Sequence, residues 1–495
     1  MSATPHGIVA AGHPLTAQAG VDALRAGGNA VDAAVAAMLT SWVTEPLLSG
    51  PGAGGYMLVA GAGEQPVLLD FFVAAPGYGA DGRERAPLVA VEVDFGGDAR
   101  QVFHVGASSC GTYGNPAGVD AAMRRWGSMP LAELAEPAAA LARDGVVLNA
   151  EQAEVVHLLE AILRSTPEVQ DLYALGGPLL CEGQLFRSRE LADTIARLGS
   201  DGCEPFYRGD IADAVVACVG AGGGVLTSDD LCRYEAIERA PLTVRYRGRD
   251  VLTNPPPSAG GILLALALHQ LDQAPPPPPL PLIVRAMEAA QSARTADFDE
   301  GLVAPGFAAR LLGSRMGATT HISVVDGDGR ACSVTCTNGE GSGIVVPHSG
   351  IQLNNIMGEA DLNPRGFHHA PAGRRMPSMM SPTVVTAGAE VQLALGSSGS
   401  NRIRSALLQT IIAVVDHGMC AADAVAAPRV HFENDIIYAE PGTALDELRY
   451  DPYVVQHFRA PSMFFGGVQA IFRDIESGAL DGAGDPRRGG VAVAG

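Results

Sequence analysis

Aromatic residues are scarce in this 495-residue chain, and long uncharged hydrophobic runs are missing from it. Phe, Trp and Tyr make up only 5% of the residues, whereas proteins that bind single-stranded nucleic acid use aromatic side chains as stacking platforms. No uncharged apolar stretch reaches the ~20 residues that a membrane-spanning helix requires. The composition therefore predicts neither an aromatic nucleic-acid surface nor a transmembrane segment.

Basic side chains are outnumbered as well. The chain has 33 Lys and Arg residues against 54 Asp and Glu residues, and its formal net charge is −21. A surface this acidic repels phosphate backbones and anionic membranes, so we expect no nucleic-acid partner and no membrane partner. The amino-terminal segment MSATPHGIVAAGHPLT lacks the basic start and the sustained apolar stretch of a secretory signal, which favours a cytoplasmic location.

Patterns typical of disulfides, nucleotides and metals are missing too. The eight cysteines are scattered and form no CxxC pair, as expected for free thiols in a reducing compartment. Gly50-x-Gly52-x-x-Gly55 has dinucleotide-binding spacing, but it follows a predicted helix and precedes a strand, the wrong order for that function. We interpret these glycines as points of close backbone approach around a pocket. His368 and His369 are adjacent and point apart, with no partner at metal-ligand spacing. We therefore expect no cofactor and no metal.

The first two thirds of the chain favour helices. Apolar residues at helical spacing predict a helix over residues 15–24, and Asn29 can cap a second, almost wholly apolar helix from Ala30 to Trp42. The next segments are a buried strand over 56–60, helices over 116–198 and 206–234, a strand-like stretch over 242–252 and an exposed five-proline connector over 275–279.

After residue 318 the pattern becomes strand-rich. Residues 320–325 alternate and are β-branched, Asp326-Gly327-Asp328-Gly329 is a hairpin turn signal, and residues 331–337 form the return strand. The remaining expected elements are strands at 351–353, 383–385 and 391–395, a helix at 403–415, and a last hairpin from 468–472 and 491–493. Strands stacked between helical segments predict an α+β protein with a four-layer α/β/β/α sandwich.

The segment around the start of the first of these strands has features that a hairpin alone does not explain. Gly317-Ala318-Thr319-Thr320-His321 and the strand after it closely resemble the autoprocessing site of the γ-glutamyltransferase (γ-glutamyl transpeptidase) family, whose members are N-terminal-nucleophile hydrolases. The resemblance covers almost the whole chain. The matching blocks are GIVAAGHPLTAQAGVDALRAGGNAVDAAVA, SGPGAGGYMLV, MPLAELAEPAAALARDGVVLN, FYRGDIADAV, GGVLTSDDLCRYEAIERAPLTVRYRG, NPPPSAGG, TTHISVVDGDGRACSV, SGIQLNN, PSMMSPT, GSSGSNRI and GAGDPRRGG.

The resemblance implies that the chain breaks its own backbone between Ala318 and Thr319. The two pieces, residues 1–318 and residues 319–495, then stay associated as one intertwined domain. A hydroxyl is a weak nucleophile until a base takes its proton, and the freed α-amine of Thr319, with a pKa near ~8, is such a base. Because nucleophile and base belong to one residue, they need no separate alignment.

Supporting roles follow from the same resemblance. Thr337 corresponds to the family threonine that orients the new N-terminus and its nucleophile. Gly399 and Ser400 fall where the family has two backbone N–H donors that form an oxyanion hole. The second is usually glycine, but Ser400 keeps its backbone N–H, and one such donor typically lowers the barrier by ~3 kcal/mol. Ser378 corresponds to a serine that contacts the substrate.

The position that binds the substrate carboxylate departs from the family pattern. Phe72 stands where the family has an arginine that binds the α-carboxylate of the γ-glutamyl group. Phenylalanine makes no bidentate contact with a carboxylate. Arg374 and Arg375, just before the Ser378 loop, are candidates to replace the missing arginine.

Three further recognition positions differ. Met379 replaces the second serine of a family serine pair. Gly358 stands at the position of a family acid, and Glu359 follows one residue later. The loop after Thr337 is shorter than the family form, and Glu340 within it is a candidate for holding a substrate amine.

The sequence therefore predicts a self-processing amide hydrolase. As a γ-glutamyltransferase, it hydrolyses γ-glutamyl amides such as glutathione or transfers their acyl group to an amine or amino acid. Alternatively, it is a family amidohydrolase or acylase for a non-glutamyl amide, because Phe72 replaces the arginine. A third hypothesis is a non-catalytic binding protein that kept the fold, and the complete set of Thr319, Thr337 and Gly399 argues against it.

Overall fold

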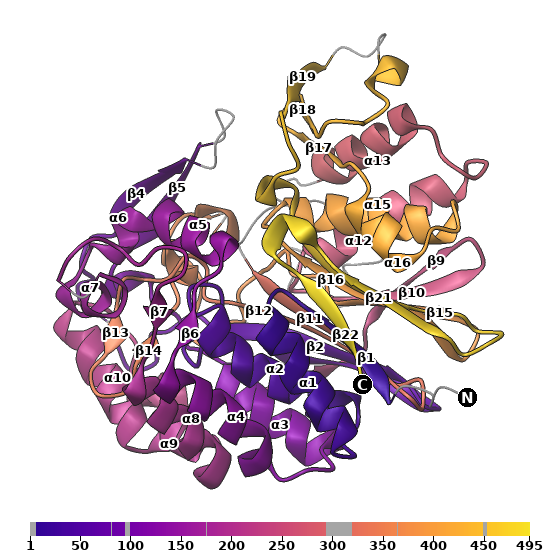
Figure 1. The fold of residues 1–495 in the computed structure, drawn as a ribbon. Coiled ribbons are helices and arrows are strands. Elements are labelled where there is room, and N and C mark those ends of the chain that lie inside the picture. Colours follow the sequence, from indigo (N-terminus) through magenta and orange to yellow (C-terminus); the bar gives the residue numbers. More distant parts are fainter. Residues whose placement is uncertain are drawn as a thin grey trace.

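The computed structural model of the protein describes residues 6–80, 82–94, 100–174, 176–293, 319–363, 365–448 and 453–495. Two antiparallel β-sheets are stacked face to face, and helices cover the outer face of each sheet (Figure 1). The predicted four-layer α/β/β/α sandwich is therefore confirmed. Ala318, the residue expected before the cleavage point, lies outside the described residues.

The first sheet has seven strands in the order β22-β1-β11-β12-β2-β3-β8. Its central hairpin, β11 and β12, comes from the segment after residue 318 and inserts between two amino-terminal strands. Every residue of this hairpin's strands is buried, because one face meets helices and the other meets the second sheet. The strands are β1 (Gly7–Ala11), β2 (Gly54–Gly61), β3 (Glu64–Phe71), β8 (Ile237–Arg239), β11 (Thr320–Asp326), β12 (Ala331–Thr337) and β22 (Val491–Ala494).

The second sheet has six strands in the order β21-β20-β16-β15-β10-β9. It too combines strands from both sides of residue 318, so neither half of the chain can complete either sheet alone. The strands are β9 (Leu242–Tyr246), β10 (Arg249–Thr253), β15 (Thr383–Ala387), β16 (Glu390–Ser398), β20 (Gly467–Arg473) and β21 (Leu480–Gly484).

Separate sets of helices cover the two sheets (Figure 1). On the first sheet lie α1 (Pro14–Arg25), α2 (Ala30–Thr44) and α3 (Asn115–Trp126). Outside them, α4 (Leu131–Asp144) packs on α2 and α8 (Arg189–Asp201) packs on α4, followed by α9 (Glu204–Arg208), α10 (Asp210–Ala221) and α11 (Ser228–Cys232). On the second sheet lie α12 (Gly260–Asp272), α15 (Arg402–Val415) and α16 (Ala421–Ala426), with α13 (Leu280–Ser292) packed on α12.

Smaller elements surround one end of the sandwich. They include α5 (Ala150–Leu158), α6 (Glu160–Leu163), α7 (Pro167–Tyr173) and the strand pairs β4 (Val89–Asp94) with β5 (Arg100–Val105), β6 (Val146–Val147) with β7 (Leu185–Phe186), and β13 (Val345–Val346) with β14 (Ile351–Gln352). A three-stranded sheet contains β17 (Val430–Glu433), β18 (Ile436–Ala439) and β19 (Val454–His457). Short 3-10 turns η6 (Met463–Phe465) and η7 (Pro486–Arg488) lie near the carboxyl terminus.

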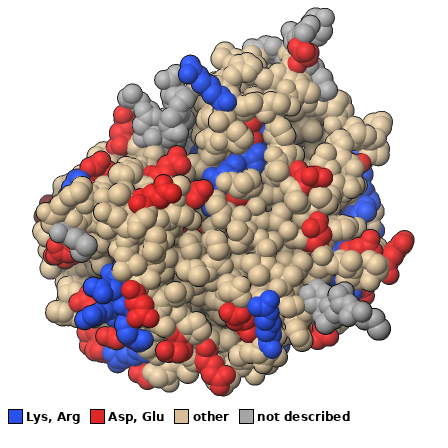
Figure 2. Space-filling model, in the orientation of Figure 1, with Lys and Arg blue, Asp and Glu red and all other residues tan. Residues whose placement is uncertain are grey.

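Charged side chains are spread over the surface. Figure 2 shows acidic groups scattered across one face instead of gathered in one patch, with several basic groups set in a recess near its middle. The net charge of −21 is therefore distributed, and a local basic site can exist within an acidic molecule.

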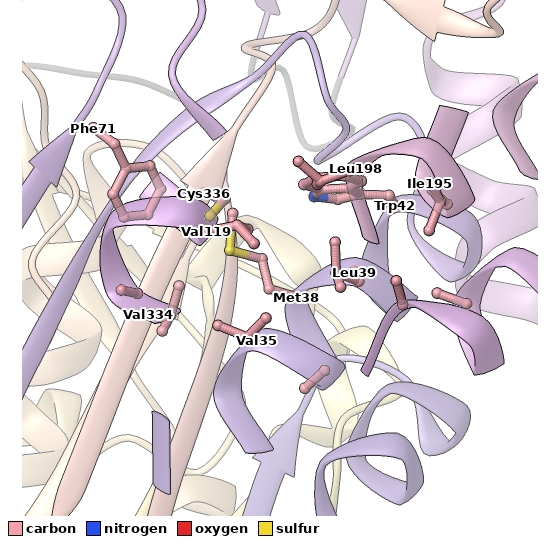
Figure 3. Packing of buried hydrophobic residues seen from close by; sticks show 14 of the residues in the cluster. Val35, Met38, Leu39, Trp42, Phe71, Val119, Ile195, Leu198, Val334 and Cys336 are labelled. Carbon is pink, nitrogen blue, oxygen red and sulfur yellow. The ribbon is translucent and has the colours of Figure 1, made fainter. Parts of the chain in front are cut away.

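The largest apolar core lies between α2 and the first sheet. All residues of α2 are buried. Figure 3 shows its Val35 and Met38 on the side of Val334 and Cys336 of β12, and its Trp42 on the side of Ile195 and Leu198 of α8. Burying one such side chain contributes roughly 1.5–3 kcal/mol. Because β11 and β12 sit at the centre of this core, the end of the hairpin is held rigidly.

Most predicted elements agree with the structure, and one is wrong. The helix expected over 15–24 is α1, and Asn29 caps α2 with a complete capping box. The stretch over 242–252 contains two strands, β9 and β10. The predicted hairpin of 468–472 with 491–493 does not form, because β20 pairs with β16 and β21 while β22 pairs with β1 in the other sheet. Strand alternation is the same for both arrangements, so the pattern could not choose the partner.

Predictions about loops and thiols are confirmed. Residues 275–279 are mostly exposed and join α12 to α13. Gly52 makes a close backbone approach, because a Cβ there would collide with the backbone of Gln352. Cys332 and Cys336 are both buried in the same core cluster and are unpaired.

Candidate active site

The register of β11 with β12 brings the expected nucleophile and its expected partner together. Thr320 pairs with Cys336 in this antiparallel ladder, so Thr319 and Thr337, one residue outward on either strand, are neighbours at the same end of the sheet. Thr319 is 1% exposed and Thr337 is 3% exposed. Both residues are therefore enclosed at the end of the most deeply buried hairpin.

Two acidic residues, Glu340 of the loop after β12 and Glu359 of a later segment, lie at the loop that follows Thr337. The hydroxyl of Thr337 accepts a hydrogen bond from the Gly339 N–H at 2.8 Å. The Asn355 side chain accepts one from the Glu340 N–H at 3.0 Å. Gly339 has a φ of +64°, and a Cβ at this position would collide with the carboxylate of Glu359. The structure thus gathers Thr337, Glu340 and Glu359, three predicted site residues, around one short loop.

Gly399 and Ser400 form a strained turn between β16 and α15. Their φ values are +111° and +66°, a region that residues with a Cβ rarely adopt. A Cβ on Gly399 would lie 2.6 Å from the Cα of Gly466, so only glycine fits there. Ser398, directly before the turn, lines the same cavity as Thr320. The turn therefore lies near the start of β11, as an oxyanion hole for Thr319 requires.

A buried hydrogen-bonded chain supports this turn, and sequence reasoning missed it. The Asn401 side-chain amide donates to the carboxylate of Glu433, whose other oxygen lies 3.4 Å from Nε2 of His431. The Ser405 hydroxyl lies 2.9 Å from Nδ1 of the same ring. Burial lowers the pKa of His431 to about 4, so the ring is neutral at pH 7. These residues come from α15 and β17, and only the fold brings them together.

A second polar network lies between the two sheets. Nδ1 of His321 lies 2.8 Å from the Thr335 hydroxyl, and Nε2 lies 3.0 Å from the Ser323 hydroxyl. Ser323 in turn donates to the backbone carbonyl of Gln469 at 3.0 Å in the opposite sheet. Burial lowers the pKa of His321 to about 3. In the sequence, the alternation of polar residues along the otherwise apolar strand of residues 320–325 could have indicated this network.

Glu45, just after α2, contacts the residue next to the expected nucleophile. The Thr320 hydroxyl donates to its Oε1 at 3.0 Å. Burial raises the pKa of Glu45 to about 7, while the Thr320 hydrogen bond and the charge of Arg488 act against that rise. An acidic residue directly after an almost wholly apolar helix was the signal that sequence reasoning overlooked.

Ser378 and Met379 are held by the loop before α12. The Ser378 carbonyl accepts hydrogen bonds from the N–H groups of Ala259 and Gly260 at 2.8 and 3.2 Å. The Ser378 hydroxyl accepts one from the Met380 N–H at 3.0 Å. Met379 is 1% exposed and packs in an apolar cluster with residues of α12 and α13. Its side chain therefore fills the core beneath the loop.

Phe72 is part of the core between the sheets. It is fully buried and stacks on Tyr56 with ring centroids 5.5 Å apart. Its carbonyl accepts a hydrogen bond from the Tyr234 hydroxyl at 2.6 Å. The ring occupies apolar space and offers no positive charge to a carboxylate.

The two candidate replacement arginines are not equivalent. Arg375 is nearly buried, forms an ion pair with Asp70 at 3.2 Å and lies over the Tyr234 ring. Asp70 also pairs with Arg239 at 2.7 Å, so Arg375 belongs to a structural ion network beside Phe72. Arg374 lines a separate cleft, where burial and then the charge of a neighbouring arginine lower its pKa. Arg375 is therefore directed to Asp70 and Tyr234, and Arg374 to a cleft whose lining includes no residue of the loop after Thr337.

Two findings concern other site types. Among the residues that the structure describes, no group of three or more His, Cys, Asp or Glu side chains is arranged to hold a metal ion. Within the same ranges, no helix is long and apolar enough to cross a membrane.

The fold and the nucleophile strand together define the class of protein. A four-layer sandwich in which a buried threonine precedes a central strand is the architecture of N-terminal-nucleophile hydrolases. The particular family follows from comparison with known proteins. The family described as Gamma-glutamyltranspeptidase matches residues 16–318 and 312–495, and the chain belongs to this family.

Individual relatives carry two kinds of name. The glutathione hydrolase proenzyme of Escherichia coli (strain K12) is 31% identical over 97% of this chain and 90% of its own length. The Acylase ACY 1 proenzyme of Pseudomonas sp. (strain SE83) is 29% identical over 99% of this chain and 93% of its own. The crystal structure of cephalosporin acylase from Bacillus halodurans superposes with a TM-score of 0.82 at 26% identity, over 99% of this chain and 96% of that one. The protein is thus an enzyme of a family that includes both glutathione hydrolases and acylases.

Proposed function

We propose that the protein cleaves its own backbone before Thr319 and then hydrolyses amides through an ester on the Thr319 hydroxyl. The observation that carries this proposal is the position of Thr319, buried beside Thr337 at the start of β11 and close to the Gly399–Ser400 turn. Relatives named proenzymes support a processed active form. The pieces 1–318 and 319–495 remain together because both sheets contain strands from each piece.

Self-cleavage requires only groups of this chain and one water. The Thr319 hydroxyl oxygen attacks the carbonyl carbon of residue 318, the peptide C–N bond breaks, and the hydroxyl proton passes to the new amine. Water then hydrolyses the ester, which releases a carboxylate on the first piece and restores the hydroxyl. The freed α-amine is now available as a base.

Amide hydrolysis repeats the same bond changes on a substrate. The α-amine takes the Thr319 proton as the hydroxyl attacks, and that proton leaves with the amine product. The carbonyl oxygen becomes negatively charged in this step, and backbone N–H groups of Gly399 and Ser400 stabilise it. Thr337 orients the nucleophile, and a water molecule or an acceptor amine then removes the acyl group.

A second candidate concerns the acyl group. The γ-glutamyl reading requires a basic group for the α-carboxylate, whereas Phe72 is buried in apolar core and Arg375 is engaged with Asp70. The Thr337 loop is flanked by two acidic residues, Glu340 and Glu359. A carboxylate side chain suits a substrate amine and not a substrate carboxylate. We therefore favour an acyl group that carries an amine and lacks the α-carboxylate.

Intact mass and N-terminal sequencing of the purified protein test self-cleavage. We expect two pieces from the wild type, the smaller beginning at Thr319, and an uncut chain from Thr319→Ala. Thr320→Ala is the matched control, because it alters the neighbouring hydroxyl and keeps the nucleophile, so it should still be cut. An uncut wild type, or a Thr319→Ala chain cut at the same bond, would refute the proposal and favour the binding-protein hypothesis.

Two substrates that differ in one group test the acyl preference. The p-nitroanilides of γ-glutamic acid and of 4-aminobutyric acid share the leaving group and the amine, and only the former has the α-carboxylate. We expect kcat/KM values within about threefold of each other, since a bidentate arginine contact would separate them by roughly tenfold or more. A tenfold preference for the γ-glutamyl compound would reject the second candidate and support the γ-glutamyltransferase reading.

A further inference from the structure

A cavity lies beside the start of β11, on the side away from the Thr337 loop. In the first sheet β11 stands between β1 and β12. The Thr337 loop with Glu359 follows β12, whereas Gly12 follows β1 and lies against the carboxylate of Glu45. The cavity is lined by Glu45, Thr320 and Arg488, so it occupies the β1 side of the nucleophile.

The walls of this cavity are apolar. Leu47 and Leu48 contribute from the segment after α2, Leu148 and Val155 from the region of β6 and α5, and Phe186 from β7. Such walls favour an apolar group, because its transfer from water is worth roughly 25 cal/mol per Å² of buried surface. Polar lining residues lie at the start of α5, where Asn149, Glu151 and Gln152 line the cavity, and also at the end near Thr320 and Ser398.

Two ionisable side chains of opposite charge form that polar end. Oε1 of Glu45 accepts from Thr320, while its enclosed Oε2 has no hydrogen-bond partner among the described residues. Arg488 donates to the Met463 carbonyl at 3.1 Å, and its Nε has no partner within the described chain. Leaving such buried atoms unsatisfied is unfavourable, and a ligand with one amine and one carboxylate would satisfy both.

Arg488 also reaches the oxyanion turn. Its Nη2 would lie 3.6 Å from a Cβ on Gly399, and Ser398 of the same turn lines the cavity. The polar end of the cavity therefore contacts both Thr320 and the Gly399 turn. In the proposed reaction these two elements lie on either side of the substrate carbonyl that Thr319 attacks.

We propose that this cavity binds the amine half of the amide substrate, an amino acid with a bulky apolar side chain. Its nitrogen faces Glu45, its carboxylate faces Arg488 and its side chain lies among the apolar walls. The inference rests on the proposed function, which assigns the acyl half to the Thr337 loop on the opposite side. The cavity then selects both the leaving group in hydrolysis and the acceptor in acyl transfer.

The test compares amides that differ only in the amine half. The substrates are glycine and phenylalanine, each joined through its nitrogen to the acyl group of 4-aminobutyric acid or to the γ-acyl group of glutamic acid. Hydrolysis of each substrate is measured for the wild type, for Val155→Asp and for His157→Asp. Val155 lines the cavity, whereas His157 is exposed on the same helix, so the control adds an equal charge outside it. We expect the wild type to prefer phenylalanine by at least tenfold in kcat/KM. We expect only Val155→Asp to lose that preference, measured as the ratio of phenylalanine-amide to glycine-amide kcat/KM.

A second comparison tests the polar end. Phenylalanine and 2-phenylethylamine leaving groups differ only in the carboxylate. We expect the wild type to hydrolyse the phenylalanine amide with the higher kcat/KM and Arg488→Gln to hydrolyse the two amides equally. An equal loss on glycine and phenylalanine amides in Val155→Asp, or no preference in the wild type, would overturn the proposal.

Direct binding separates this inference from the proposed function. Titration calorimetry with free phenylalanine and free glycine measures the cavity without any chemistry. Tighter phenylalanine binding that Val155→Asp abolishes, together with no Thr319-dependent hydrolysis of any amide, would refute the proposed function and leave the cavity assignment in place. Hydrolysis without any difference between the two amino acids in binding or turnover would refute the cavity assignment alone.

Discussion

The proposed nucleophile region and the proposed acyl-recognition region of this enzyme differ in how closely their residues match the family pattern. Around Thr319, Thr337 and Gly399 the pattern is intact, whereas Phe72 and Met379 have replaced the polar residues expected by resemblance. Catalysis by an N-terminal threonine depends on strand register and on a backbone turn, which many packing contacts hold. Recognition depends on single side chains, which can become part of the core without disturbing the fold.

The comparison also extends to polar groups. Near the Gly399–Ser400 turn and within β11, buried His431 and His321 are held by hydroxyl and carboxylate partners. Around Phe72, the charges of Asp70, Arg239 and Arg375 are paired with one another. The first set keeps the machinery rigid, and the second leaves no free charge for a ligand carboxylate.

The largest expected effect comes from disrupting the Gly399–Ser400 turn, the proposed oxyanion hole. Gly399→Ala adds a Cβ at a φ of +111°, where it would lie 2.6 Å from the Gly466 backbone. We expect kcat for an amide substrate to fall by roughly 10²–10³-fold, as when an oxyanion-hole donor is lost. Gly388→Ala is the matched control, because Gly388 has a φ of +63° with nothing within 4 Å of the added Cβ. Equal activity in both variants would mean that the Gly399 turn is not an oxyanion hole.

The next effect sharpens the recognition side. Phe72→Arg would bury a cation in apolar core beside Tyr56, and its desolvation should lower the free energy of unfolding by several kcal/mol. Urea denaturation measures the change, with Val89→Arg as a control at a position that is 57% exposed. A Phe72→Arg protein of wild-type stability that gains γ-glutamyl turnover would show instead that this position opens to the substrate.

The smallest effect is a pH dependence of stability. Burial lowers the pKa of His13 and His431 to about 4 and that of His321 to about 3, against about 6.5 in the unfolded chain. The unfolded state therefore binds more protons below pH 6.5, so stability is lost as the pH falls from about 6.5 toward 4. We expect each histidine to account for about 2 kcal/mol at pH 5 relative to pH 7.5.

Urea midpoints at the two pH values check this loss. Glu45 has the opposite effect on the pH dependence of stability. Because its pKa is raised to about 7, its contribution to the free energy of unfolding is largest below about pH 4.5. That contribution is lost as the pH rises through 7. Glu45→Gln should therefore steepen the net acid loss. Identical midpoints at pH 5 and pH 7.5 in the wild type would contradict the assignment of neutral buried histidines.

Local patterns predicted much of the fold and part of the candidate site. The Asp326–Gly329 turn signal and the alternation on either side of it predicted β11 and β12, and antiparallel pairing then made Thr319 and Thr337 neighbours. The same patterns could not assign β22 to β1 or β20 to β21, because partner choice depends on contacts between segments far apart in sequence. Glu45, which meets Thr320 from α2, was missed for the same reason.

The sequence by itself determined the class of chemistry, the strand that carries Thr319 and the family to which the chain belongs. These depend on residue types at short spacing, where alternation, turn signals and contiguous blocks are sufficient. The tertiary structure decided that Phe72 is core, that Arg375 belongs to an ion network, and that Glu45 and Arg488 meet at the end of an apolar cavity. Burial and charge pairing are set by which distant segments pack together, and no local pattern encodes that packing.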